Sequence, residues 1–91
     1  MQVVFEADRF RSAAYDGETC VGIAECEEQE GHRIITHTEV DPAYGGQGIA
    51  RRLSEEIAAA ARRAGEKIVP LCSYAAKMMC GKEAYRDVCA D

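Results

Sequence analysis

The stretch YGGQGIARRL, from Tyr44 to Leu53, holds the residues whose types and spacing most directly suggest chemistry. Three glycines fall within five residues, and Arg51 and Arg52 follow in what reads as the first turn of a helix. A helix N-terminus offers unpaired N–H groups and positive potential, and glycines let the backbone wrap closely around an oxyanion. A bound anion would also offset the unfavourable placement of two cations at this end of the helix dipole. The turn therefore predicts an anion site, with a tight strand-to-helix turn and solvated arginines as the alternative.

The turn does not match the two commonest nucleotide-binding loops. A Walker A loop needs lysine and then serine or threonine after its last glycine, but Ile49 and Ala50 follow Gly48. A Rossmann fingerprint needs glycine or alanine three residues after Gly48, and that position is Arg51. Another kind of anion-binding loop has to be considered.

Three titratable side chains stand near the ends of predicted strands and could move protons or accept a group. His37 and Glu39 alternate on one face of a predicted strand, close to its carboxyl end. Cys72 follows a second predicted strand and precedes a helix N-terminus, a position that favours the reactive thiolate. Each residue also has a structural interpretation: a core histidine bonded to the backbone, an exposed strand glutamate and a buried cysteine.

The elements that must position these residues begin with strands joined by tight turns. Asp-Gly at 16–17 and Glu-Gly at 30–31 are turn signals, and Asp41-Pro42 stops the last run because proline cannot donate to a ladder. Four runs of β-forming residues predict strands over residues 2–5, 9–15, 19–28 and 32–40.

The second half of the chain changes to helical spacing. Apolar residues form one stripe from Ile49 to Ala64, and Gly65 is well placed to end that helix. The remaining predicted elements are a strand over 67–71, a helix over 74–79 capped by Ser73, and a helical segment over 82–89. Met78, Met79 and Tyr85 are expected in the core.

The order of elements predicts a fold class. The long helix joins the strand ending at Val40 to the strand starting near Lys67, so these two strands should be parallel if they are neighbours in one sheet. We predict one α/β domain over residues 1–91, with a mixed, mainly antiparallel sheet and one parallel strand–helix–strand crossover. A ligand site is expected at the ends of those two strands.

Composition limits the classes of function. A net charge of −5 argues against a general nucleic-acid binder or a binder of anionic membranes. No apolar run approaches the roughly 20 residues of a membrane span, and the N-terminus lacks the apolar centre of a signal peptide. We expect a cytoplasmic protein that is a monomer or a weak dimer.

The five cysteines do not form a recognisable metal or disulfide pattern. None makes a CxxC pair, and both histidines lie far from them in the sequence. We predict reduced thiols and no metal site. Apart from Cys72, the cysteines are expected to serve packing: Cys20, Cys26, Cys80 and Cys89.

Three motifs together resemble a known family. HTEVDPAYGGQGIARRL, residues 37–53, resembles the acetyl-CoA-binding signature of the GNAT acetyltransferase superfamily, in which a strand ends in valine and a glycine-containing loop opens the helix that holds the CoA pyrophosphate. With HTEV, GQGIA and PLCSY in this order, the chain is most similar to the minimal, single-domain GNAT-like N-acetyltransferase family (YjdJ type). The resemblance covers roughly residues 32–85.

The resemblance implies a cosubstrate, acetyl-CoA, and the residues that bind it. Val40 would pair its backbone with the pantetheine arm where the two parallel strands splay, and Pro70 suits a strand that leaves its neighbour. Arg51 is expected beside the bound phosphates for a separate reason, because an anion there would offset its unfavourable place at the start of the helix. The pyrophosphate loop would comprise Gly45, Gly46, Gln47, Gly48, Ile49 and Ala50.

Acyl transfer to an amine needs a base for the ammonium and a proton for the leaving thiolate. Glu39 lies near the position where larger members often carry a carboxylate base, and His37 is the second candidate. Cys72 matches a cysteine of the minimal family and would form an acyl-cysteine or protonate the CoA thiolate. By this resemblance, the tyrosine that larger relatives use for that protonation falls within one residue of Met79, which leaves Cys72 and Tyr74 as substitutes.

Two departures from the superfamily pattern affect these expectations. The first loop position, usually arginine, is Gly45, which removes one side-chain contact with CoA. Larger members carry two helices between their first two strands, and this chain has only about four residues there, so the amine acceptor (a small amine or a protein lysine) is the least determined partner. We predict an acetyl-CoA-binding N-acetyltransferase. The alternative is a CoA-binding module with little turnover that acts as a sensor or partner-binding protein.

Overall fold

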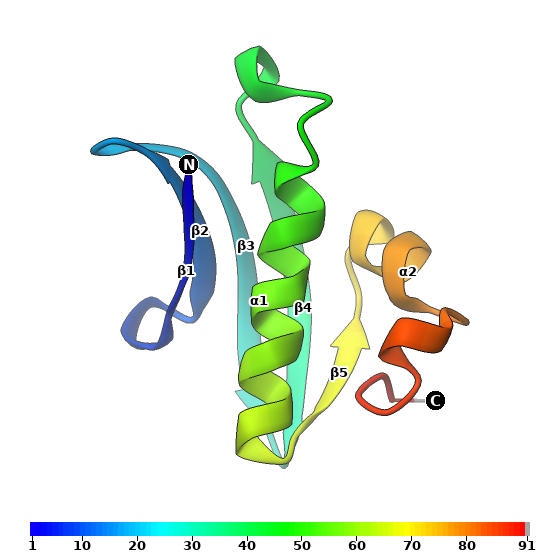
Figure 1. The fold of residues 1–91 in the computed structure, drawn as a ribbon. Coiled ribbons are helices and arrows are strands. Elements are labelled where there is room, and N and C mark those ends of the chain that lie inside the picture. The colour runs from blue at the N-terminus through cyan, green and yellow to red at the C-terminus, as the bar shows by residue number, and fades with distance from the viewer. Residues whose placement is uncertain (91) are drawn as a thin grey trace.

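The computed structural model describes residues 1–90 as a five-stranded sheet crossed by one long helix (Figure 1). The strands follow one another across the sheet in chain order: β1 (Gln2–Glu6), β2 (Arg11–Asp16), β3 (Thr19–Gln29), β4 (His32–Val40) and β5 (Lys67–Pro70). The helices are α1 (Ile49–Ala64) and α2 (Ser73–Met79), with short 3-10 helices η1 (Ala7–Arg9), η2 (Pro42–Tyr44) and η3 (Glu83–Tyr85). None of the helices in this range is long and apolar enough to span a membrane.

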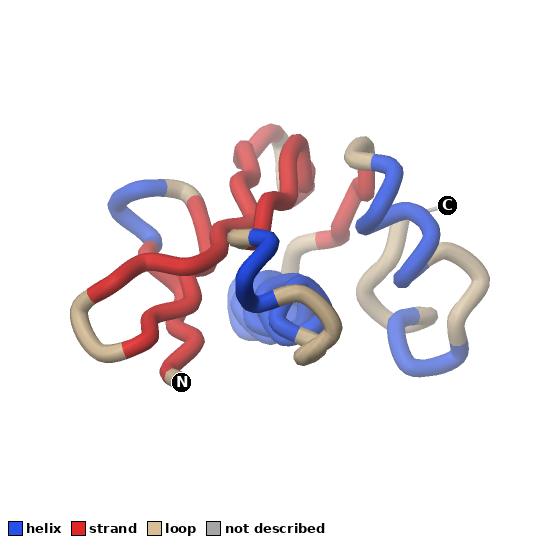
Figure 2. The backbone as a smooth tube through the Cα atoms, turned by 90° about the horizontal axis from the view of Figure 1, so that it is seen from above, coloured by secondary structure: helices blue, strands red, loops and turns tan. Residues whose placement is uncertain are grey.

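The predicted fold class is confirmed. Strands β1 to β4 pair antiparallel, and β4 pairs with β5 in parallel through the α1 crossover. Helix α1 begins and ends where the apolar stripe predicted, and Gly65 ends it with φ of 70° and an N–H that donates to Ala61 and Arg62 carbonyls. Figure 2 shows α1 end-on, lying against one face of the sheet while β5 and α2 extend to one side.

Helix α1 packs closely against the centre of the sheet. Leu53 and Ile57 are fully buried, as are Ile35 on β4 and Ile68 on β5. Gly22 on β3 makes the close approach feasible, because a Cβ at that position would stand 3.3 Å from the Leu53 side chain. The core therefore places the start of α1 over the first residues of β3 and the last residues of β4.

The parallel strands β4 and β5 separate halfway along β4. Their pairing runs from His32 opposite Lys67 to Ile35 opposite Pro70 and then stops. The backbone N–H groups of Leu71 and Cys72 both donate to the Ile35 carbonyl, at 3.0 and 3.1 Å, before the chain turns into α2. Pro70 has no N–H to extend the ladder. Among residues 1–90 no strand therefore pairs with this edge of β4 beyond Ile35.

A β-bulge changes which face each residue of β4 occupies. Cys26 on β3 lies opposite Ile35, whereas its neighbour Glu25 lies opposite His37, so Thr36 is the extra residue. Plain alternation would place Ile35 and His37 on the same face. The bulge instead leaves Ile35 buried under α1 and turns His37 to the opposite, exposed face.

Some local predictions are wrong. Strand β2 begins at Arg11, because η1 and a left-handed Phe10 (φ 53°) precede it. The cap of α2 is Cys72, whose sulfur accepts the Ala75 N–H, and Ser73 is the first helical residue. The predicted helical segment 82–89 contains only the single turn η3, after which Cys89 bridges to Ile68.

The cysteines differ in exposure more than predicted. Among residues 1–90 no two cysteines form a disulfide. Cys26 is buried, and burial raises the pKa of its thiol. Cys20 and Cys80 are exposed, which contradicts the packing role predicted for them. Met79 and Tyr85 are buried in the core, and Met78 packs against it, as predicted.

Candidate functional site

The glycine turn between β4 and α1 has a backbone that only glycine adopts easily. Gly46 and Gly48 have φ of 78° and 73°, in the left-handed region, and Gly48 is the N-cap of α1. A Cβ at either position would meet no atom within 4 Å, so backbone conformation rather than crowding favours glycine there. Gly45 is extended and bonds through its N–H to the Pro42 carbonyl at 3.1 Å, while Gln47 is exposed. The predicted loop therefore presents an open backbone surface.

The first turn of α1 has backbone N–H groups with no acceptor inside the helix. The N–H of Arg52 bonds to the Gly48 carbonyl at 3.1 Å, whereas Ile49, Ala50 and Arg51 precede the first residue that can make such a bond. The first turn contains no acidic residue. Arg51 is exposed, and its closest carboxylate oxygen, on Glu55, is 3.7 Å away. These amides and cations can bind an anion such as a phosphate.

Hydrogen bonds hold the turn on the side facing the sheet. The Asp41 carboxylate accepts the Ala43 N–H at 2.9 Å, and the Asp41 N–H donates to the Val21 carbonyl at 2.8 Å. The Tyr44 hydroxyl donates to the Asp16 carboxylate at 2.6 Å, and this hydrogen bond raises the pKa of Tyr44. The loop is thus anchored to the β2–β3 turn while its glycines stay open.

Cys72 lies where β5 leaves β4. Its sulfur is 3.5 Å from the Thr38 hydroxyl of β4 and accepts the Ala75 N–H at 3.3 Å. The residue is partly exposed and packs against the core. The thiol is therefore held at the start of α2, beside the part of β4 that β5 no longer pairs.

Glu39 and His37 lie on the other face of β4. Glu39 stands opposite Ile23 and His37 opposite Glu25, and both side chains are exposed. Their neighbour Thr38, which contacts Cys72, points to the α1 side because successive residues of a strand alternate. Val40 also packs against the core on that side. The structure thus brings Cys72 to β4 but on a different face from Glu39 and His37.

Glu39 lines a cavity of about 590 Å³ at the edge of the sheet where β3 begins and β4 ends. Asp41 is a second carboxylate in its wall. Arg11 also lines it, but its guanidinium is bonded to Glu6 at 2.7 Å, which partly neutralises it. Residues 20–23 and 39–42 supply the rest of the wall. The cavity is suited to a cationic group.

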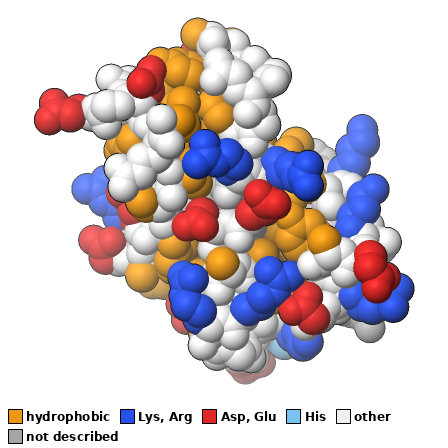
Figure 3. Space-filling view, viewed as in Figure 1, with side chains coloured by type: hydrophobic (Ala, Val, Ile, Leu, Met, Phe, Trp, Pro, Cys, Tyr) orange, Lys and Arg blue, Asp and Glu red, His pale blue; other side chains and the backbone are white. Residues whose placement is uncertain are grey.

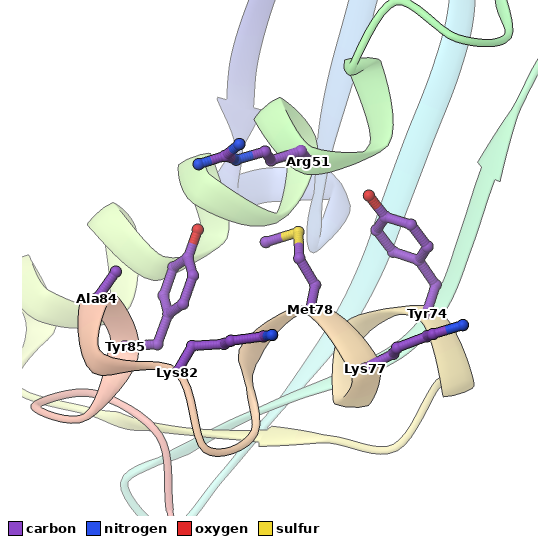
Figure 4. Close-up of a pocket in the computed structure, with 7 residues that line it drawn as sticks. All are labelled: Arg51, Tyr74, Lys77, Met78, Lys82, Ala84 and Tyr85. Atoms are coloured by element: carbon purple, nitrogen blue, oxygen red, sulfur yellow. The ribbon is translucent and has the colours of Figure 1, made fainter.

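A second cavity, of about 470 Å³, lies between α1 and the C-terminal segment (Figure 4). In the close-up, Arg51 projects from α1 on one side, and Met78, Lys82 and Tyr85 project from the other. Tyr85 is 7% exposed, and burial is the main cause that raises the pKa of its hydroxyl. The lining residues are Arg51, Tyr74, Lys77, Met78, Lys82, Ala84 and Tyr85.

Basic and apolar groups share this face of the molecule. Figure 3 shows Lys and Arg side chains over α1 and over the C-terminal segment, with hydrophobic surface exposed between them. Sequence reasoning did not assign Thr38, Lys77 or Lys82 to the site. Thr38 is found only through its contact with Cys72, and the two lysines only through the packing of the C-terminal segment beside α1.

The chain is similar to known proteins in sequence and in fold. The family model described as GCN5-related N-acetyl-transferase matches residues 9–88. The NMR solution structure of a "GCN5-like putative N-acetyltransferase" from Staphylococcus aureus superimposes with a TM-score of 0.76 at 23% identity, covering 98% of this chain and 87% of that chain. At that identity the structural likeness establishes the fold. No curated protein matches the chain significantly. The predicted membership of the GNAT superfamily is confirmed, and the chain belongs to the GCN5-related N-acetyltransferase family.

Proposed function

We propose that this chain is an acetyl-CoA-dependent N-acetyltransferase. One observation carries the proposal: the unpaired amides at the start of α1 adjoin the edge of β4 that β5 leaves unpaired. Pyrophosphate needs converging N–H donors and cations, and a pantetheine arm carries amides that can pair with a strand edge. Both requirements are met at one end of the sheet.

The residues that would hold acetyl-CoA follow from this arrangement. The amides of residues 46–51 would bind the pyrophosphate, with Arg51 beside it. The backbone of residues 36–40, ending at Val40, would pair with the pantetheine arm. The open space above Gly46 and Gly48, where a Cβ would meet no atom within 4 Å, fits a phosphate close to the backbone.

Acetyl transfer forms a C–N bond between the amine and the acetyl carbonyl carbon and breaks the C–S bond of the thioester. The attacking amine loses a proton, and the departing CoA thiolate takes one up. Glu39 is the proposed base because it is exposed, has no ion-pair partner among residues 1–90, and lines a cavity that also contains Asp41. His37, on the same face, is the second candidate.

Cys72 is the residue that we propose acts on the thioester of acetyl-CoA. Its sulfur lies beside the unpaired part of β4, where it could protonate the CoA thiolate or take up the acetyl group itself. The second route runs through an acetyl-cysteine, with the CoA thiolate released before the amine attacks. The location of Glu39 and Cys72 on different faces of β4 suits a reaction in which amine and thioester approach from opposite sides.

The test is turnover with acetyl-CoA and a panel of primary amines, followed by mass spectrometry of the amines and of the intact protein. We expect an acetylated amine and an equal amount of free CoA. Cys72→Ala should abolish transfer, and Cys80→Ala, at the other end of α2, should not. A protein that binds CoA but acetylates neither an amine nor itself would contradict the proposal and leave a binding module.

A further inference from the structure

We propose that the acceptor amine is a diamine, whose reacting end lies at Glu39 and whose second ammonium is held by the Asp41 carboxylate. This inference rests on the proposed function and names the class of amine that it uses. The site is the cavity of about 590 Å³ where β3 begins and β4 ends. That volume falls within the range of small-ligand sites, roughly 300–1,000 Å³.

Two carboxylates, Glu39 and Asp41, lie in the wall of this cavity. Asp41 directly follows β4, and its N–H donates to the Val21 carbonyl at 2.8 Å, so the extended backbone continues through it. Alternate residues of an extended strand point to the same side and lie about 7 Å apart. Among residues 1–90 neither carboxylate pairs with a cation, and Asp41 accepts only the Ala43 N–H, at 2.9 Å. Both can therefore receive an ammonium group of a ligand.

The basic residue of the wall, Arg11, is already neutralised. Arg11 donates through Nε to Glu6 at 2.7 Å, and the Tyr15 hydroxyl donates to the other oxygen of Glu6 at 2.6 Å. The hydrogen bonds from Tyr15 and Arg11 lower the pKa of Glu6, so Glu6 carries its negative charge at neutral pH. Within residues 1–90 the wall thus has two unpaired negative charges and no unpaired positive charge. An acceptor with a carboxylate of its own is disfavoured, and one with a second ammonium is favoured.

Apolar surface lies beside the two carboxylates. Ile23 stands directly opposite Glu39 across the β3–β4 ladder and is half-buried, and Pro42 follows Asp41. A short methylene chain can contact these side chains while its charged ends reach the carboxylates. The reacting amine would lose its proton to Glu39, whereas the second ammonium keeps its charge beside Asp41. Asp41 is therefore assigned to specificity and Glu39 to proton transfer.

The experiment measures kcat/KM for acetyl transfer to three amines that share the same methylene chain and differ at its far end. Putrescine carries a second ammonium there, n-pentylamine a methyl group and δ-aminovalerate a carboxylate. Per reacting amine, we expect the parent to prefer putrescine over n-pentylamine about fivefold, the effect of one exposed ion pair. δ-Aminovalerate should be the poorest acceptor. Added NaCl should reduce the preference for putrescine, because it screens exposed charges.

Two variants test the assignment of Asp41. Asp41→Asn removes the charge while its side-chain oxygen can still accept the Ala43 N–H, and its preference for putrescine should disappear. Glu27→Gln is the matched control, because it removes an exposed carboxylate of β3 outside the cavity wall, and it should keep the parent's preference. Melting temperatures equal to the parent's check that both variants are folded.

A second measurement does not depend on turnover. Titration of the ¹⁵N-labelled protein with putrescine, without acetyl-CoA, should shift the amides of residues 39–42 in the parent and much less in Asp41→Asn.

The outcomes separate this inference from the proposed function. Equal use of putrescine and n-pentylamine by the parent, or a preference that survives in folded Asp41→Asn, would overturn the diamine site alone. Failure of the parent to acetylate any amine would contradict the proposed function instead. The titration then decides on the site: shifts at residues 39–42 that are lost in Asp41→Asn support it, and their absence overturns it.

Discussion

Replacing the glycines of the turn tests whether they serve the fold or the ligand. Gly48→Ala places an L side chain at φ of 73°, which costs about 1–2 kcal/mol in folding free energy. The added methyl group meets no atom within 4 Å, so no steric term adds to that cost. The methyl would, however, occupy space above the amides that we assign to the pyrophosphate. We therefore expect CoA affinity to fall at least tenfold, or about 1.4 kcal/mol, in Gly48→Ala and in Gly46→Ala.

Gly65→Ala is the matched control for this prediction. Gly65 caps the other end of the same helix with φ of 70°, and a Cβ there also meets no atom within 4 Å. The strain is similar, so urea denaturation should give similar losses of unfolding free energy for Gly48→Ala and Gly65→Ala. Calorimetric titration with CoA should separate them. Equal CoA affinity in the two folded variants would refute the assignment of the turn to a phosphate.

Four further perturbations follow from the same structure. Arg51→Ala/Arg52→Ala should make the ligand-free protein slightly more stable and reduce the rise in melting temperature caused by CoA, because cations at a helix start are unfavourable until an anion arrives; an unchanged CoA-induced shift would mean that both arginines are merely solvated. CoA at about ten times its Kd should slow iodoacetamide alkylation of Cys72 roughly tenfold while leaving exposed Cys80 unaffected, and peptide mass spectrometry that finds both thiols equally protected, or neither, would count against Cys72 at the site. The Cys72→Ser variant should be nearly inactive in acetyl transfer if an acetyl-cysteine forms. It should keep activity if Cys72 only supplies a proton to the CoA thiolate. Glu66→Ala should destabilise the protein by about 3 kcal/mol, since it leaves Arg33, whose side chain is 5% exposed, with Glu28 as its one carboxylate partner among residues 1–90. Glu83→Ala, from the exposed pair with Arg86, should cost no more than about 0.5 kcal/mol in the same denaturation experiment.

The parts of the fold that follow from local pattern were predictable. The α1 stripe has a strong helical period and a glycine at its end, so both bounds, Ile49 and Ala64, agree with the structure. The parallel relation of β4 and β5 follows from the crossover, and their separation begins at Pro70, where the backbone donor is missing.

Features set by pairing between distant residues were not predictable. The bulge at Thr36 arises from the register with β3 and decides that His37 and Glu39 face away from α1. The cap of α2 is a sulfur, although Ser73 is the better capping residue by propensity, because Cys72 is already held by its contact with Ile35. The cavity with Lys77 and Lys82 exists only because the C-terminal segment packs beside α1.

The most direct test of the central claim is a nuclear magnetic resonance titration of the ¹⁵N-labelled protein with CoA. If CoA binds where we propose, the largest amide shifts will fall on residues 46–51 at the start of α1 and on residues 36–40 along the unpaired edge of β4. The β1–β2 end of the sheet, with the amides of residues 2–9, should change little. Saturable binding with its largest shifts at that end, or no binding at millimolar CoA, would contradict the account.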